Sequence, residues 1–215
     1  LPQLFARIIV ANGTLPVLEK GGNPFRVQNP VVIDPELGDF SSILPRRGGR
    51  LARWFREKLT PLLWARFFQK WIRYALTAPN FTPSQVVQAV SHIELSPAEL
   101  AAYNAPYPSF IYKAAVRTFP SMVAAIEENN SSAWENLGKY TKPFLFLGGE
   151  LDHNMGRMEN QRLLTSHIPG AAGQAHERYP NAAHFIQEDE GEALGHKVVD
   201  FMKKAPVDRT TEENE

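Results

Sequence analysis

The chain has 215 residues, of which 43% are hydrophobic, and it carries 23 basic and 23 acidic side chains but no cysteine. This length can bury the core of one domain, or of one domain with an attached lobe, and a net charge of zero provides no overall field that would attract nucleic acid or an anionic membrane. The lack of cysteine excludes disulfides, thiolate nucleophiles and cysteine-ligated metal centres, and it suits the reducing cytoplasm in which we expect the protein to act.

The first predicted element is a short strand in ARIIVAN, residues 6–12. Its β-branched run indicates a fully buried strand that ends at an Asn-Gly turn. A natural domain seldom begins so close to a buried strand, so we expect upstream elements that this sequence lacks. Pro and Gly are frequent from Thr14 to about Ser42, which predicts a loop with an extended piece at Val31–Ile33.

Residues 46–76 form the most basic segment of the chain, with nine Lys or Arg and one Glu. Apolar side chains recur there at helical spacing, and Pro61 should break or restart the helix. The apolar positions are Leu51, Trp54, Phe55, Leu59, Leu62 and Leu63. A basic amphipathic helix could bind a membrane surface or a nucleic acid. The neutral net charge and the mid-chain position favour the alternative, a lobe helix with a buried aromatic face and solvated arginines.

Short helices are predicted between residues 77 and 137. TAPNFTPSQVVQAV and SPAELAAY each resemble a helix start, and in the second Ser96 and Glu99 match a capping box with Pro97 at the first helical position. A helical pattern also follows the Pro-bounded loop in APYPSFIYKAAVRTFPSMVAAIEENN, and SAWENLGKY predicts one more short helix.

Strands and helices alternate from residue 136 onward. KPFLFLGGELDHNMG predicts a buried strand and an acidic turn, MENQRLLTSHIPG a helix that Pro169 and Gly170 stop, and QAHERYPNAAHF a strand and loop. EDEGEALGHKVVDFMKK predicts one closing helix, with acids in its first turn and lysines in its last, as the helix dipole favours. Its predicted buried stripe is Leu194, Val198 and Phe201. Residues 205–215 have little to bury and are predicted to form a frayed tail.

The order of these elements is strand, long helical insertion, strand, helix, strand, helix, which predicts an α/β fold with a parallel sheet. Three strands are too few for a self-sufficient doubly wound sheet, which again leads us to expect missing upstream elements. We divide the chain into a core strand at 1–13, a helical lobe at 14–135, the rest of the core at 136–204 and the tail at 205–215.

Two polar residues follow predicted strands at the edge where open parallel sheets form their sites. Asp152 follows FLFLGGEL, and His184 follows the last strand. A carboxylate that accepts the imidazole Nδ1 proton fixes the tautomer and leaves Nε2 as a base. Asp152 could instead form a turn or cap a helix, and His184 could be a core histidine with one hydrogen bond. The order strand–acid, helix, strand–histidine, acidic helix favours the catalytic interpretation.

Other motifs for chemistry are weak. No pair of histidines has the spacing, with a third ligand, that a zinc site needs, and the sequence has no Gly-rich phosphate loop and no serine in a G-x-S-x-G elbow. Of the five remaining histidines, His153 adjoins Asp152 and is expected to be exposed. The other four lie on predicted helix faces or in loops, and they are His92, His167, His176 and His196. We therefore expect no metal or nucleotide cofactor, and any nucleophile should lie on residues outside this sequence.

Several segments together resemble the haloalkane dehalogenases of the α/β-hydrolase fold. They are ARIIVANGTLP, SPAELAAYNAPYP with YKAAVRTFP, LFLGGELD, and IPGA with NAAHFIQEDEGE, in the order of the family. APYPSFIYKAAVRTFP is the most specific of them, although Ser109 and Phe110 replace the acidic pair that usually follows the second proline of that motif. The resemblance implies an α/β-hydrolase fold, of which this chain would hold three sheet strands and an inserted helical cap.

The resemblance also implies hydrolysis of carbon–halogen bonds in small apolar substrates, with water as cosubstrate, halide as product, and no cofactor, nucleic acid or membrane. A nucleophilic aspartate, expected upstream of this chain, forms an alkyl-enzyme ester that a histidine-activated water hydrolyses. By position His184 matches that histidine and Asp152 the acid that orients it. Some subfamilies place a Glu after the earlier strand, where Asn12 cannot supply the charge. Alone, these 215 residues should be inactive.

In this family two N–H donors help the halide to leave. One usually follows the nucleophile, and the other can be a cap tryptophan, for which Trp71 in FFQKWIRYAL is the best positional match. Phe68 is expected to line the same pocket. A core indole on an amphipathic helix is an equally good interpretation of Trp71. The basic segment at 19–66 is longer than is usual for a family cap, and it could reshape the access tunnel.

An epoxide hydrolase or esterase of the same fold is the nearest alternative. Epoxide hydrolases use cap tyrosines, and the available ones are Tyr74, Tyr103, Tyr107 and Tyr112, none of them in a motif of that family. An Asp-Trp pair at the nucleophile elbow would favour a dehalogenase, and a Ser there an esterase. The alternative from another class is a non-catalytic binding module built on the basic helix at 46–76, which salt-sensitive binding would support.

Overall fold

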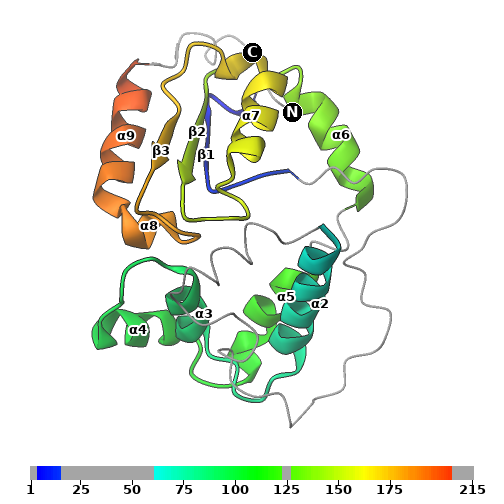
Figure 1. Cartoon of the computed structure of the whole chain (residues 1–215), viewed down its shortest axis with the longest axis vertical. Coiled ribbons are helices and arrows are strands. Elements are labelled where there is room, and N and C mark those ends of the chain that lie inside the picture. The colour runs from blue at the N-terminus through cyan, green and yellow to red at the C-terminus, as the bar shows by residue number, and fades with distance from the viewer. Residues whose placement is uncertain (1–3, 16–60, 123–126, 205–215) are drawn as a thin grey trace. The chain divides into compact units, whose positions relative to one another are not determined.

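A computed structural model of the protein describes residues 4–15, 61–122 and 127–204 (Figure 1). The chain folds as two compact units, residues 1–15 with 132–215, and residues 16–131. The first unit contains a parallel sheet, and the second contains only helices among its described residues. The predictions for the loop at 14–42, for the apolar positions at 46–60 and for the tail at 205–215 lie mostly or wholly outside the described residues.

Within the described ranges, the sheet has three parallel strands in the order β1-β2-β3. Strand β1 is Ile8–Ala11, β2 is Phe144–Gly149 and β3 is Glu177–Tyr179. Ile8 pairs in register with Phe144, and Leu147 with Glu177. Because both pairings are parallel, the C-terminal ends of the three strands lie at the same edge of the sheet. The predicted parallel α/β arrangement is confirmed.

Strand β2 occupies the centre of the sheet, and each of its six residues is buried. This is the expected environment of a parallel strand covered on both faces. The prediction that β1 is fully buried is wrong, because Ile8, Ile9 and Val10 are half-buried and Ala11 is exposed. Among the described residues β1 pairs with another strand on the β2 side alone.

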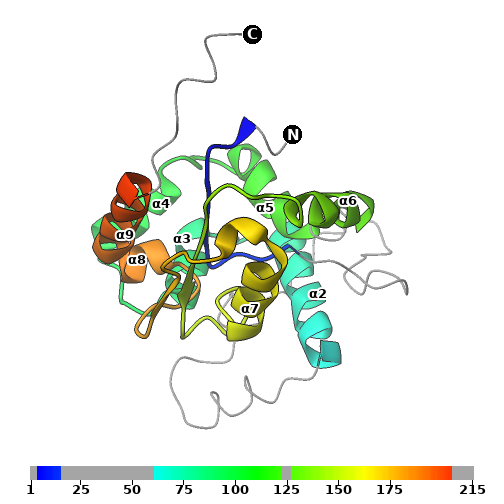
Figure 2. The ribbon, with the colours of Figure 1, turned by 90° about the horizontal axis from the view of Figure 1, so that it is seen from above.

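Alternate residues of β2 point to opposite faces of the sheet, and each face has its own apolar cluster. Phe144 and Phe146 pack with helix α7 (Met158–His167) and with the end of α6 (Glu127–Leu137). Leu145 and Leu147 pack with α8 (Ile186–Asp189) and α9 (Gly191–Lys204). Figures 1 and 2 show α7 and α6 on one side of the strands and α8 and α9 on the other. The sheet unit is therefore three layers thick.

The closing helix differs from its prediction. Instead of one helix, α8 ends at Asp189 and α9 begins at Gly191, with Glu190 between them at φ −139°. The acids are consequently divided between two first turns. The predicted stripe is confirmed, since Phe201 is buried and Leu194 and Val198 pack against the same cluster. The predicted end of α7 is confirmed as well, because the helix stops at His167 before the 3-10 turn η4 at Pro169–Ala171.

Among its described residues, the helical unit contains α2 (Pro61–Thr77), α3 (Pro83–Val90), α4 (Pro97–Asn104), the 3-10 turn η3 (Ile111–Lys113), α5 (Ala114–Met122) and the beginning of α6. The predicted capping box of α4 is present, because Ser96 Oγ accepts from the Glu99 N–H and the Glu99 carboxylate accepts from the Ser96 N–H. Arg117 of α5 is buried and donates to the carbonyls of Leu76 and Ala78 at 2.9 Å each. This guanidinium satisfies carbonyls at the end of α2 and thereby joins α5 to α2.

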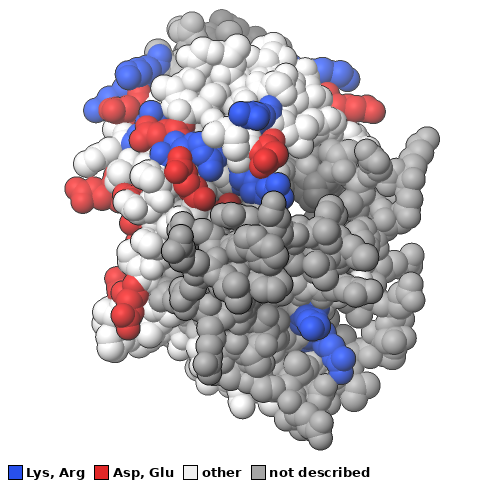
Figure 3. All heavy atoms as spheres, viewed as in Figure 1, with Lys and Arg blue, Asp and Glu red and all other residues white. Residues whose placement is uncertain are grey.

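Acidic and basic side chains are intermixed on the visible face of the sheet unit (Figure 3). Within the sheet unit, ion pairs join Arg157 to Glu159 at 3.2 Å and Arg178 to Glu150 at 3.7 Å. An intermixed surface does not create the single-sign field that attracts a polyanion. No helix within the described ranges is long and apolar enough to cross a bilayer.

Candidate active site

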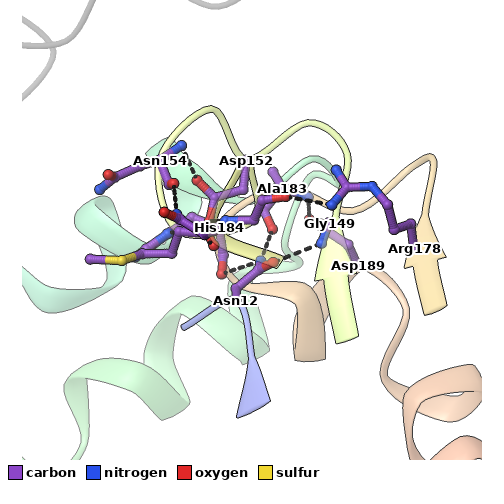
Figure 4. Close-up of polar contacts among 11 residues, drawn as sticks. Asn12, Gly149, Asp152, Asn154, Arg178, Ala183, His184 and Asp189 are labelled. Carbon is purple, nitrogen blue, oxygen red and sulfur yellow. Dashed lines mark hydrogen bonds and ion pairs between the residues drawn. The ribbon is translucent and has the colours of Figure 1, made fainter. Parts of the chain in front are cut away.

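The ends of the three strands bring Asn12, Asp152 and His184 together (Figure 4). Asn12 comes directly after β1, Asp152 lies in the turn after β2, and His184 lies in the loop after β3. Backbone hydrogen bonds hold the second and third segments side by side, from Glu150 N–H to the Tyr179 carbonyl and from Leu151 N–H to the Ala182 carbonyl, at 2.9 Å each. The parallel sheet therefore builds one polar cluster at its C-terminal edge.

Asp152 is the most enclosed group of this cluster, with a side chain only 4% exposed. Its Oδ1 accepts from the Asn154 N–H at 2.9 Å, and its Oδ2 accepts from the Gly156 N–H at 3.1 Å. Its Oδ2 also lies 2.9 Å from Nδ1 of His184. Burial raises the pKa of Asp152, but the bond and charge of His184 and the two N–H donors outweigh it, so the pKa lies below its ordinary value of 3.8.

The turn that holds Asp152 is closely packed. A Cβ on Gly156 would meet the Gly149 carbonyl, and would lie 2.7 Å from Asn12 Oδ1 and 2.9 Å from the Asp152 Cβ. Arg178 of β3 donates through Nη1 to the Gly156 carbonyl at 2.8 Å. Glycine at 156 and the guanidinium of Arg178 together let the backbone wrap around the carboxylate.

His184 is bound on one side of its ring and accessible on the other. The contact with Asp152 engages Nδ1, and Nε2 has no hydrogen-bond partner within the described ranges. An ionised carboxylate only accepts, so Nδ1 carries the proton and Nε2 of the neutral ring presents a lone pair. The side chain is 39% exposed, and its ring meets the Phe185 ring edge-on at 5.7 Å. Such a histidine can accept a proton from a water molecule.

The sequence predicts Asn12 only as a turn residue without charge, whereas the structure makes it a hydrogen-bonding member of this cluster. Its Nδ2 donates to the carbonyls of Ala183 at 2.6 Å and His184 at 3.1 Å, while its Oδ1 accepts from the Gly149 N–H at 2.7 Å. Its φ of +45° is left-handed, a conformation that Asn tolerates better than most residues. The Asn-Gly pair at a strand end indicated the turn but not these three partners.

Asp189 is the other residue whose part in the cluster was missed. Sequence reasoning assigned it to the first turn of a helix, whereas its Oδ2 accepts from the Ala183 N–H at 2.7 Å. That bond ties α8 back to the loop that carries His184. A run of acids at a helix start gives no sign of such a partner, because helix dipoles favour acids there in any case.

The predicted halide-site residues belong to the helical unit, so they are described within it. Trp71 and Phe68 lie one turn apart on α2, and both are half-buried. The Trp71 ring lies 6.2 Å from the rings of Tyr74 and Phe81, within the apolar cluster of α2, α3 and α5. These contacts suit the interpretation of Trp71 as a packed indole, and its role toward halide stays a prediction.

The arrangement can carry out acid–base chemistry through Nε2 of His184. Across the described ranges, no group of three or more His, Cys, Asp or Glu side chains is placed to hold a metal ion. His153, next to Asp152 in sequence, is exposed, as its position in an acidic turn predicts.

No protein-family model matches the sequence. Individual proteins do, and the haloalkane dehalogenase of Mycobacterium marinum is 40% identical over 140 residues, which are 63% of this chain and 46% of that protein. The haloalkane dehalogenase of Psychrobacter cryohalolentis is 36% identical over 144 residues, which are 65% of this chain and 47% of that protein. The chain thus spans about half the length of the curated relatives it matches.

Solved structures share the fold at lower sequence identity. A loop variant of haloalkane dehalogenase DbeA from Bradyrhizobium elkanii is 19% identical with a TM-score of 0.57, over 70% of this chain and 54% of that one. Haloalkane dehalogenase DpaA from Paraglaciecola agarilytica is 18% identical with a TM-score of 0.54, over 94% of this chain and 51% of that one. Both structures support the predicted α/β-hydrolase fold. Over nearly two thirds of its length, this chain is homologous to haloalkane dehalogenases, and its described residues form part of their α/β-hydrolase fold.

Proposed function

We propose that the protein containing this chain hydrolyses the carbon–halogen bond of small apolar haloalkanes, giving an alcohol, a halide ion and a proton. The observation that carries the proposal is the pair formed by buried Asp152 and half-exposed His184, 2.9 Å apart at the carboxyl edge of a parallel sheet. The names of the relatives supply the class of substrate. We further propose that the enzyme acts in the cytoplasm and needs no nucleic acid or membrane.

The proposed reaction has two steps. A carboxylate on residues outside this chain attacks the carbon that bears the halogen, so that a carbon–oxygen bond forms and the halide leaves with the bonding electrons. His184 Nε2 then takes a proton from water, and the resulting hydroxide attacks the carbonyl carbon of the alkyl-enzyme ester. The ester bond to the alkoxide breaks, the alkoxide takes the proton from His184, and the alcohol leaves. The carboxylate is regenerated as its acid form loses a proton to water.

Asp152 has a distinct part in this scheme. The imidazolium that forms at His184 during water attack is stabilised by a carboxylate at 2.9 Å, inside a turn that holds the charge with two N–H donors. The lowered pKa of Asp152 keeps that carboxylate ionised at neutral pH. Asp152 thus orients the base and balances its charge, without itself accepting the proton.

We also propose that the Trp71 indole donates to the departing halide and that Phe68 lines the same pocket. Their neighbouring positions on one face of α2 support the proposal. The test is quenching of tryptophan fluorescence by bromide in the full-length protein. Trp71→Phe should lower the affinity for bromide roughly tenfold, whereas Trp134→Phe in the sheet unit should not. Equal affinity in the wild type and both variants would contradict this assignment.

The function is tested with the full-length protein and three substrates, namely 1-bromobutane, styrene oxide and p-nitrophenyl acetate. We expect repeated turnover of 1-bromobutane, with bromide and butanol in equal amounts. Rapid hydrolysis of the epoxide or the ester, with no bromide released, would favour the alternative enzymes of the same fold. In a single turnover in ¹⁸O-labelled water, the ester mechanism leaves the label in the protein, and direct attack of water on the substrate places it in butanol.

A further inference from the structure

We propose that Asn12 is a positioning residue for the acid–histidine pair, and that its amide sets where His184 stands relative to Asp152. The geometric part of this inference stands on the structure alone. Its consequence for the reaction rests on the proposed function. Asn12 acts through the backbone, because its amide bonds to peptide groups of the His184 loop and not to the reactive Nε2.

The amide of Asn12 connects three chain segments that are far apart in sequence. Its oxygen accepts from Gly149, the last residue of β2, and its nitrogen donates to the carbonyls of Ala183 and His184. Gly149 also accepts from the Asp152 N–H at 3.3 Å, so the same residue begins the Asp152 turn. One side chain therefore links the segment that carries the acid to the segment that carries the base, beside the backbone hydrogen bonds that join them (Figure 4).

The three bonds require both ends of a neutral amide. One group must accept from an N–H while the other donates to two carbonyls, and an Asn side chain does both within two bonds of its Cβ. A carboxylate at this position would place negative charge against the Ala183 and His184 carbonyls. Asn12 is buried, so water cannot readily replace a lost partner.

The loop has a second attachment, which makes a positioning role testable. Ala183 donates its N–H to Asp189 and accepts from Asn12, so both of its peptide groups are held, each by a different element. Loss of the Asn12 amide leaves the Asp189 bond and the apolar cluster around Ala182 and Ile186 in place. We therefore expect the loop to shift and the sheet unit to stay folded.

Two variants of the full-length protein distinguish the effect of the Asn12 amide from the effect of its positive φ. Asn12→Asp keeps the size and the tolerance of positive φ but removes the donors, and Asn12→Gly keeps the tolerance of positive φ but removes all three bonds. The matched control is Asn104→Asp in the helical unit. Asn104 likewise uses both ends of its amide, accepting from the Ser84 N–H at 3.1 Å and donating to Ser84 Oγ at 2.8 Å.

The first measurement is the proton NMR signal of the His184 Nδ1–H, which reports its hydrogen bond to Asp152. We expect a protected downfield signal in the wild type and in Asn104→Asp, and its loss or a marked upfield shift in both Asn12 variants. The second measurement is transient kinetics with 1-bromobutane. Hydrolysis of the alkyl-enzyme should slow roughly 10- to 100-fold in the Asn12 variants, and its formation should change far less.

The results of the two measurements would contradict different parts of the proposals. If folded Asn12 variants keep the wild-type Nδ1–H signal, the positioning role is wrong, whatever the kinetics show. If the wild type releases no bromide, the proposed function is wrong, while the NMR comparison still decides whether Asn12 positions His184. If both kinetic steps slow equally in the Asn12 variants, the residue has a general structural role and the inference is overturned.

Discussion

Two histidines stand at opposite ends of β3, and the structure uses them in opposite ways. His176 precedes the strand, where its Nδ1 accepts from the Phe146 N–H at 3.0 Å and its Nε2 lies 3.1 Å from the Ala171 carbonyl. His184 follows the strand, with Nδ1 on the Asp152 carboxylate and Nε2 without a partner among described residues. Both rings are part-buried and each Nδ1 makes a hydrogen bond, so burial does not distinguish the two histidines.

The two histidines differ in how their hydrogen-bond partners occupy the two ring nitrogens. Because a backbone N–H occupies Nδ1 of His176, the proton is on Nε2, and both nitrogens serve the backbone. Burial lowers the pKa of His176 below its ordinary value of 6.5, as does the charge of Lys197, against the opposing effect of the Ala171 carbonyl. A carboxylate on Nδ1 of His184 instead leaves the other nitrogen for chemistry. His176 is therefore a structural histidine, and His184 is the candidate base.

The largest expected effect concerns the partner of His184. In Asp152→Asn an amide N–H can donate to Nδ1, which would move the imidazole proton to Nε2 and remove the base. We expect the rate of alkyl-enzyme hydrolysis in the full-length protein to fall roughly 10³- to 10⁴-fold. His176→Asn is the control, since its amide oxygen can replace Nδ1 as acceptor. A loss smaller than about tenfold in Asp152→Asn, or an equal loss in the control, would remove the distinction between the two histidines.

A smaller effect tests the turn that holds the acid. In Gly156→Ala the new Cβ would approach the Gly149 carbonyl and crowd Asn12 and Asp152, so we expect a loss of about 1–3 kcal/mol of unfolding free energy. Gly195→Ala is the control, because nothing lies within 4 Å of its Cβ position and it lies within α9. That variant should be stabilised by about 0.5–1 kcal/mol in urea unfolding. Tolerance of Gly156→Ala would show that the turn is not closely packed.

The pH dependence of stability should separate His176 from Asp152. With the folded pKa of His176 below 6.5, the unfolded chain takes up protons first as the pH falls, so stability is complete above about 6.5 and declines just below it. Asp152 has a folded pKa below 3.8, so its contribution is kept down to about that pH and lost on further acidification. His176→Asn should flatten the decline between pH 7 and 5 and leave the acid limb unchanged. A decline of the same slope in the variant would contradict this origin.

The smallest effect concerns Tyr179, which ends β3 between the two histidines. Its hydroxyl is buried and has no hydrogen-bond partner among the described residues, and burial, with Glu177 and Glu190, raises its pKa to about 12. Tyr179→Phe should leave stability unchanged or raise it by up to about 1 kcal/mol. Tyr140→Phe is the control, because its hydroxyl donates to the Phe5 carbonyl at 3.3 Å and its loss should be slightly destabilising. A large loss in Tyr179→Phe would indicate a partner for this hydroxyl.

The sequence identified the strands on either side of the site because their signals are local. Buried runs, a capping box and a stop at Pro169 depend on neighbouring residues, and the order of strands then placed Asp152 and His184 at one edge of the sheet. The contact between their side chains follows from parallel topology, which makes strand ends coincide.

What could not be predicted depends on contacts between distant segments. The three partners of Asn12 lie more than 130 residues away in sequence, and no periodicity encodes them. The break at Glu190 has a local cause instead, since the Phe185 carbonyl and the Asp189–Ala183 bond close α8 after one turn. An acidic run at a helix start does not reveal that bond, because the helix dipole favours acids there in any case. The exposure of β1 likewise depends on which segments flank it, which its apolar pattern does not specify.

The central claim, that His184 activates water while His176 does not, is tested most directly by intact-protein mass spectrometry of two full-length variants. His184→Ala and His176→Asn are each mixed with 1-bromobutane and sampled before and after the expected turnover. We expect one bromide released per protein and a persistent butyl adduct in His184→Ala, with continued turnover and no adduct in His176→Asn. Multiple turnover without an adduct in His184→Ala would contradict the claim.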